Sequence, residues 1–171
     1  MRRLARRALG ACSVVSLAAG ARADAPPNGT DPQYGLFDGT TVVITDQHTG
    51  LHWQRTLPAQ QSLTFAQAAD YCASLSLVYP TPWRVPSYKE LLTIVDEAPH
   101  PEYEAPIVVW KAIDPDAFPH TAVGEGYWSS SIAPFSSTPQ NSAQAYMVNF
   151  NTGQALAFPQ FSSGAVRCVH D

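Results

Sequence analysis

The sequence predicts an α+β fold in which two short helices pack on small antiparallel sheets and the N- and C-terminal strands are adjacent. Capping boxes precede two segments whose apolar residues recur at helical spacing near the middle of the chain. Short segments of β-branched and aromatic residues, separated by turn residues, flank these helices on both sides. A strand near the N-terminus can pair with a strand at the C-terminal end of the chain. This pairing would bring the helix that carries Cys72 toward the last strand, which carries Cys168.

Residues 1–23 have the composition of an export signal. Residues 2–7 contain four arginines, residues 8–20 form a short apolar run, and Ala21-Arg22-Ala23 is an A-x-A cleavage site. The apolar run is shorter than the about 20 residues that span a bilayer. We therefore expect cleavage near Ala23, no membrane span, and a mature protein that is secreted, periplasmic or part of the cell envelope.

Removal of this signal changes the charge of the protein. The 171-residue chain has a formal net charge of −4, and the signal contains five of its ten basic residues and none of its fourteen acidic ones. The mature chain would then carry five basic residues against fourteen acidic ones, a net charge of −9. This balance excludes nucleic acid as a partner, because affinity for nucleic acid depends on neutralising phosphates with Lys and Arg.

The cysteine count also changes on export. Cys12 leaves with the signal, so that Cys72 and Cys168 remain. An even number of cysteines in an oxidising compartment predicts a disulfide between them. The alternative is two separate buried thiols, which would be usual in a cytosolic protein.

Residues 24–39 are expected to form an extended leader, because proline, glycine and polar residues dominate them. One domain follows over residues 40–171, a length sufficient to bury a core of its own. It begins with residues 41–45 and 51–54, two β-type segments joined by turn residues, which predict a β-hairpin.

Two capping boxes place the helices. The box at residues 64–67 predicts a helix over residues 65–75, with Cys72 on its buried face. The box at residues 87–90 predicts a shorter helix over residues 88–96.

The second half of the domain is predicted to be a loop followed by strands. Residues 98–118 contain four prolines and several acids, which predicts a long surface loop with residues 107–110 as an apolar anchor. Beyond the loop we expect four short strands, with a hairpin turn at residues 151–153; the strands cover residues 127–131, 145–150, 154–158 and 165–169.

Ten short blocks, in order over about residues 40–170, make the chain resemble the Lcl C-terminal domain family, named after a collagen-like adhesin of Legionella. The blocks are Thr45-Asp46, Thr49-Gly50-Leu51-His52-Trp53-Gln54, Ala69-Asp70-Tyr71-Cys72, Trp83-Arg84-Val85-Pro86, Glu90-Leu91-Leu92, Ala112-Ile113-Asp114, Phe118-Pro119, Tyr127-Trp128-Ser129-Ser130-Ser131, Val148-Asn149-Phe150 and Val166-Arg167-Cys168-Val169. The blocks agree with pairing of the two cysteines.

This resemblance implies a C-type-lectin-like fold, related in architecture to formylglycine-generating enzymes and to the variable proteins of diversity-generating retroelements. It also implies an extracellular role, since the adhesin that names the family binds sulfated polysaccharides and host surfaces. The sequence departs from that adhesin because it has no collagen-like Gly-x-x repeat and its mature form is strongly acidic. Both departures count against a sulfated ligand.

The aromatic residues divide into two groups. Trp53, Trp83 and Trp128 lie beside apolar neighbours, so we expect them in the core. Trp110 lies in the proline-rich segment, next to Lys111 and near Tyr103, and these three residues are our candidates for contact with a ligand. The alternative is that Trp110 anchors the loop.

No motif predicts catalysis, a cofactor or a metal. His48 and His52 fall in a predicted hairpin, where the i, i+4 spacing of a helical metal pair does not apply. Asp114 and Asp116 lack the glycine and distal glutamate of a calcium loop. Residues 129–131, three serines, lie on a predicted strand without a G-x-S-x-G elbow. We therefore expect a protein that is not an enzyme.

Two classes of function fit these features. The first is a non-enzymatic surface-binding domain that recognises a glycan or a protein through the loops between residues 98 and 141. The second is a structural or subunit-like exported domain that packs against a partner chain.

Overall fold

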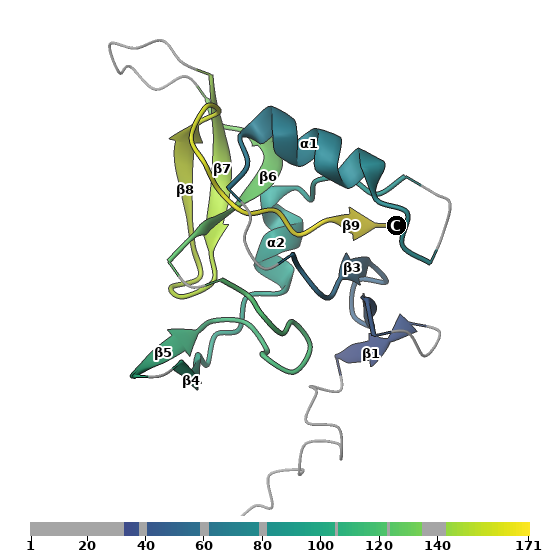
Figure 1. The fold of residues 1–171 in the computed structure, drawn as a ribbon, viewed down its shortest axis with the longest axis vertical. Helices are drawn as coiled ribbons and strands as arrows, with labels where there is room; N and C mark the ends of the chain where they lie inside the picture. Colours follow the sequence, from purple (N-terminus) through teal and green to yellow (C-terminus); the bar gives the residue numbers. More distant parts are fainter. Residues whose placement is uncertain are drawn as a thin grey trace, which may run out of the picture.

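The structure, a computed structural model, describes residues 33–37, 41–58, 62–78, 82–104, 106–122, 124–134 and 143–171 (Figure 1). The predicted export signal and its cleavage site lie outside the described residues. The elements are β1 (Tyr34–Leu36), β2 (Val43–Asp46), β3 (His52–Gln54), α1 (Phe65–Ser74), α2 (Tyr88–Thr93), β4 (His100–Glu104), β5 (Ile107–Lys111), β6 (Gly126–Ile132), β7 (Gln144–Asn149), β8 (Gln154–Pro159) and β9 (Val169–His170).

The strands form small antiparallel sheets, which confirms the predicted α+β class. Their orders are β1-β2-β3-β9, β4-β5 and β6-β7-β8. In the first sheet Trp53 of β3 pairs with Val169 of β9, so the last strand lies beside the N-terminal hairpin, as the sequence predicts. The sheet also includes β1, which falls in the segment predicted as a leader. Tyr34 of β1 is buried edge-to-face against Phe118, so the packed domain begins before residue 40.

The sheet β6-β7-β8 has a buried cluster on each face. Alternate residues of a strand point to opposite faces, so Tyr127 and Val148 pack with Leu91 of α2 in one cluster. Trp128 and Met147 pack on the other face, in the second cluster, with residues of α1; its members are Val43, Ala68, Cys72, Trp83, Val85, Trp128, Ala145, Met147, Val166 and Cys168. The sheet is therefore the central layer between the two helices.

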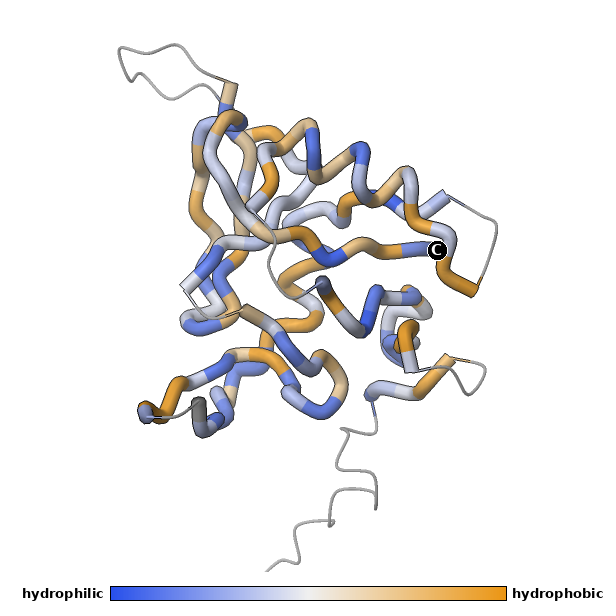
Figure 2. Tube along the Cα trace, viewed as in Figure 1, coloured by the Kyte–Doolittle hydropathy of each residue, from blue (hydrophilic) through white to orange (hydrophobic). Residues whose placement is uncertain are grey.

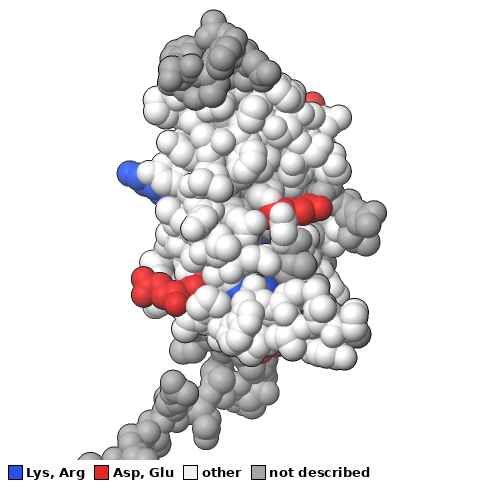
Figure 3. Space-filling model, turned by 90° about the vertical axis from the view of Figure 1, so that its left-hand side faces the viewer, with Lys and Arg blue, Asp and Glu red and all other residues white. Residues whose placement is uncertain are grey.

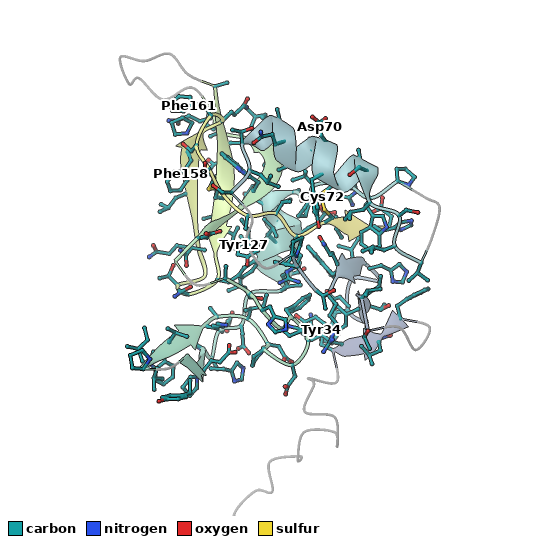
Figure 4. The ribbon with its side chains drawn as sticks, viewed as in Figure 1. Tyr34, Asp70, Cys72, Tyr127, Phe158 and Phe161 are labelled. Carbon is teal, nitrogen blue, oxygen red and sulfur yellow. A yellow bond between two sulfur atoms is a disulfide. The ribbon has the colours of Figure 1, made fainter. Side chains whose placement is uncertain are left out.

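The predicted core and disulfide are both confirmed. Trp53, Trp83 and Trp128 are fully buried, and the indole N–H of Trp128 donates to the Leu63 carbonyl at 2.7 Å. Cys72 of α1 is bonded to Cys168, with the two Cα atoms 5.5 Å apart (Figure 4). The bond fastens α1 to the segment that leads into β9.

Both predicted capping boxes are present. At the start of α1 the backbone N–H of Thr64 donates to Gln67 Oε1 at 2.9 Å, and the Gln67 N–H donates back to Thr64 Oγ1 at 3.4 Å. At α2 the Ser87 N–H donates to Glu90 Oε2 at 2.6 Å. Each cap satisfies donors that the first helical turn leaves without intrahelical partners.

The predicted loop over residues 98–118 is wrong in its first half. Residues of β4 pair with residues of β5 from His100↔Lys111 to Glu104↔Ile107, and so form a two-stranded hairpin. Pro101 obscured this strand in the sequence. A proline is tolerated at a sheet edge, because the N–H that it lacks need not face a neighbouring strand.

Two boundaries also differ from the prediction. Of the predicted strand 165–169 only Val169 belongs to a strand, and β9 joins the N-terminal sheet, while Ala165 forms an isolated bridge with Tyr127. The second helix ends at Thr93 instead of residue 96. The Val95 N–H donates to the carbonyl of Leu92, three residues back, which ends the α-helical pattern.

The cap of α2 is extended by an ion pair. Arg84 donates from both terminal nitrogens to Glu90, at 2.9 and 2.8 Å, and also bonds Asp171 near the C-terminus. The hydrogen bond from Arg84, with those from Ser87, lowers the pKa of Glu90 from 4.5 to about 2. A folded-state pKa below the unfolded value means that the ionised carboxylate stabilises the fold above about pH 4.5 and loses this effect as pH falls through about 2.

We expect Glu90→Gln to lower the free energy of unfolding at pH 7 by about 1 kcal/mol, a modest value because solvent screens this partly exposed pair. The deficit should shrink as pH falls from about 4.5 toward about 2 and vanish below that, where the wild-type carboxylate is protonated in both states. Urea unfolding at several pH values measures it. Asp70→Asn is the control, because Asp70 is exposed on α1 and forms no ion pair with a described residue. A deficit that is constant with pH would contradict this role of Glu90.

Candidate functional site

The hairpin β4–β5 carries apolar side chains that face solvent. Pro101 pairs with Trp110, and Tyr103 pairs with Val108, and residues directly opposite each other lie on the same face of a sheet. Tyr103, Val108 and Trp110 are 71%, 56% and 57% exposed. We call these four residues the aromatic face. In Figure 1 the hairpin stands out from the body of the domain, below the sheet β6-β7-β8.

Lys111 lies on the opposite face of the same hairpin. Its register partner is His100, one position along from the pairs that form the aromatic face. The Lys111 side chain is only 3% exposed, and its ammonium lies 2.5 Å from Glu102 Oε2. The structure therefore brings Tyr103 and Trp110 together, as the sequence grouped them, and separates Lys111 from them.

The base of the hairpin is fixed by backbone contacts and not by Trp110. The Ala112 N–H donates to the Phe150 carbonyl, and the Asp96 N–H donates to the Ala112 carbonyl at 2.9 Å. Ala112 and Ile113 are buried. The residues that anchor this segment are thus the two that follow β5, which leaves the Trp110 side chain available for contact.

A second surface is a cleft beside β8, which we call the β8 cleft. Its volume is about 260 Å³. Met147, Leu156 and Phe158 contribute apolar surface to it; the other described residues that line it are Ser62, Gly124, Glu125, Gly126, Asn149, Gln154, Ser163 and Gly164. Figure 4 shows Phe158 and Phe161 at the β8 edge of the molecule, and Figure 2 shows hydrophobic residues along that edge.

The β8 cleft is not evident from the sequence. Gln154, Leu156 and Phe158 alternate with smaller residues in β8, a pattern that is typical of a strand with one face in the core. In the structure this is the face that α1 covers over β6 and β7, but Leu156 and Phe158 remain 53% and 37% exposed. The alternation in β8 indicates which face of the strand points toward the core. It does not show that the layer formed by α1 ends before it covers Leu156 and Phe158.

Three of the polar residues weighed in the sequence, Asp114, Ser129 and His52, have structural partners. Asp114 Oδ1 accepts from the N–H groups of Asp116 and Ala117 at 2.8 and 2.9 Å, which closes a turn. The Ser129 hydroxyl donates to the Tyr146 carbonyl at 2.8 Å. His52 Nδ1 lies 2.9 Å from the Thr45 hydroxyl, and burial lowers the pKa of His52. Within the described ranges, no three His, Cys, Asp or Glu side chains gather as metal ligands.

The fold and these two surfaces define a disulfide-closed α+β domain with apolar side chains displayed to solvent. A family model described as the Lcl C-terminal domain matches residues 42–170. Because this match covers most of the chain, the protein belongs to the Lcl C-terminal domain family. No curated protein is similar enough to give a match. Among the helices that the structure describes, none is long and apolar enough to cross a membrane.

Proposed function

We propose that the protein is an exported, non-enzymatic binding domain of C-type-lectin-like architecture, which recognises a partner at the cell surface through the aromatic face of β4–β5. The observation that carries this proposal is the solvent exposure of Tyr103, Val108 and Trp110 on one side of an ordered hairpin. A contiguous exposed apolar patch on a soluble domain marks an interaction site more often than a scattered apolar residue does.

The residue types favour a protein partner at this face. Tyr and Trp are the residues that most often dominate binding energy at protein interfaces. The hairpin is already paired over its whole length, so little backbone order has to be gained on binding. The face contains no cationic side chain, because Lys111 is turned to the opposite side and paired with Glu102. A sulfated polysaccharide would therefore find no counter-charge on it.

The rival function uses the same face differently. A structural or subunit-like domain would bury Tyr103 and Trp110 permanently against a partner chain. Size-exclusion chromatography with light scattering on residues 24–171 separates the two functions. A monomer that binds surface proteins supports our proposal, and a stable oligomer that buries the aromatic face supports the rival.

Trp110→Ala is expected to weaken partner binding by about 2 kcal/mol, roughly thirtyfold in affinity, and to leave the melting temperature nearly unchanged. The reason is that the Trp110 side chain is mostly exposed in the free domain. The measurement is binding of labelled domain to arrays of extracellular proteins and of glycans. Leu36→Ala is the matched control, because Leu36 is an exposed apolar residue of another sheet. Equal loss of binding in both variants, or a large loss of stability in Trp110→Ala, would refute the role of the aromatic face.

A further inference from the structure

The β8 cleft is framed by backbone that is already hydrogen-bonded. Leu63 and Gly164 exchange both backbone hydrogen bonds, at 2.8 and 2.9 Å, and the Ala165 N–H donates to the Gly126 carbonyl at 2.9 Å. These bonds hold the segments around Ser62 and Ser163 against the sheet. The shape of the cleft therefore belongs to the folded domain and does not need a ligand to form.

Glycines allow this close approach. A Cβ atom at Gly164 would lie 2.6 Å from Met147 Cε and 2.8 Å from the Gly126 carbonyl oxygen, and a Cβ atom at Gly126 would lie 2.7 Å from Met147 Sδ. Such distances are below van der Waals contact. The thioether of Met147 fills the space that the two glycines leave, and it gives the cleft an apolar floor.

The rim of the cleft offers uncharged hydrogen-bonding groups and one carboxylate. The side chains of Ser62, Gln154, Ser163 and Glu125 form no hydrogen bond or ion pair with any described residue. Asn149 accepts from the Asn151 N–H through its amide oxygen at 2.8 Å. None of the described lining residues is Lys, Arg or His. Figure 3 shows that the side of the molecule that carries β8 bears only a few, separated charged groups.

These features disfavour two classes of ligand, anions and alkyl chains. An anionic ligand would meet Glu125 and no cation. An alkyl chain would cover the rim groups without giving them hydrogen-bond partners, which costs free energy. A neutral sugar fits both parts of the surface, because its hydroxyl groups donate and accept while its C–H groups can pack on Leu156 and Phe158.

We propose that the β8 cleft binds a neutral saccharide unit. Its volume of about 260 Å³ lies just below the ~300–1,000 Å³ of sites for drug-sized molecules, so a single unit of a longer glycan enters it. Leu156 and Phe158 pack against the sugar ring, and Glu125 and Gln154 bind its hydroxyls. The β8 cleft shares no residue with the aromatic face. Saccharide binding at the cleft can therefore be tested independently of the proposed function.

The experiment is an NMR titration of 15N-labelled residues 24–171 with a panel of neutral oligosaccharides, namely maltotriose, cellotriose, mannotriose and N-acetylchitotriose, and with a heparin tetrasaccharide. We expect at least one neutral member to shift the amide signals of Gly126 and Gly164 and the side-chain amide of Gln154. The heparin fragment should leave them unchanged.

Variants locate the binding. Leu156→Arg blocks the cleft from an exposed edge position, and Gln154→Ala removes one rim amide without adding bulk. Each variant should lower the affinity of the domain for the saccharide at least about tenfold. Trp110→Ala should change this affinity less than about twofold. Failure of the whole neutral panel would overturn the proposal, as would tighter binding of heparin. An unchanged saccharide affinity in Gln154→Ala would also overturn it. So would the finding that the cleft binds no sugar and instead binds the protein that contacts the aromatic face.

Discussion

Replacing both Cys72 and Cys168 by alanine is expected to lower the free energy of unfolding by about 4 to 5 kcal/mol, through the chain entropy that the bond removes from the unfolded state. The two cysteines are 96 residues apart, so the bond closes more than half of the chain into one loop. Such a loss is comparable to the whole stability of a marginal domain, typically ~5 to 15 kcal/mol. Urea unfolding of the oxidised domain and of the double variant measures it.

Reductant provides the internal control for this expectation. Dithiothreitol should destabilise the wild-type domain toward the level of the double variant and leave the double variant unchanged. If the two proteins unfold at the same urea concentration without reductant, the disulfide contributes nothing, and this part of the account is wrong.

Arg167→Ala is the second substitution for which we expect a large effect. Arg167 is fully buried next to Cys168. Its Nη1 donates to the carbonyls of Gln54 and Arg55 at 2.6 and 2.8 Å, and its Nη2 donates to the Thr121 hydroxyl at 2.9 Å. The guanidinium also lies 4.8 Å from the ring centroid of Phe118. One side chain thus ties the end of β3 to the segment before β6.

Burial lowers the pKa of Arg167 to about 10, so the side chain remains charged at neutral pH. No ion pair joins it to a carboxylate of the described residues, and backbone carbonyls replace water around the charge. The alanine variant leaves a cavity, and it removes this donor from the buried Gln54 carbonyl and from the partly buried Arg55 carbonyl. We expect a loss of roughly 3 to 5 kcal/mol.

Arg55→Ala is the matched control for Arg167→Ala. Arg55 also donates to two backbone carbonyls, those of Thr41 and Asp116, but its side chain is only partly buried and both hydrogen bonds lie at the surface. Its loss should cost no more than about 1 kcal/mol, since water can replace it. Equal denaturation midpoints for the two variants would show that burial of the guanidinium is not what matters.

Local patterns predicted much of the fold. Each helix, α1 and α2, is preceded by its own capping residue. Thr64 and Ser87 correctly predict the first residue of each helix. The hairpin β2–β3 follows from β-branched residues on either side of a turn. Each of these elements depends on interactions within a few residues, which is why a single sequence can show them.

The features that the sequence missed depend on distant contacts. β1 is three residues long and is stabilised by pairing with β2 and by Tyr34 against Phe118. β9 lies beside the N-terminal hairpin as predicted, but it contains only two residues, so its bounds within the predicted strand 165–169 were missed. Neither strand has enough length to show a periodicity of its own.

The candidate surfaces were predictable to different degrees. Tyr103 and Trp110 were found because large aromatic residues in a proline-rich segment are unusual, but the hairpin register that places them on one face was hidden by Pro101. Burial of Lys111 could not be foreseen, since it depends on the cross-strand position of Glu102. The β8 cleft depends on where the layer over Met147 ends, which is a property of tertiary packing.

The most direct test of an exported, disulfide-closed domain is intact mass spectrometry of the protein recovered outside the cytoplasm, alkylated before any reduction. Expression of all 171 residues in a bacterial host should give a chain that begins at Asp24 and carries no alkyl group. After reduction, the same chain should take up two alkyl groups, at Cys72 and Cys168. Two alkyl groups without reduction, or a chain that stays in the cytoplasm with residues 1–23 attached, would contradict the account.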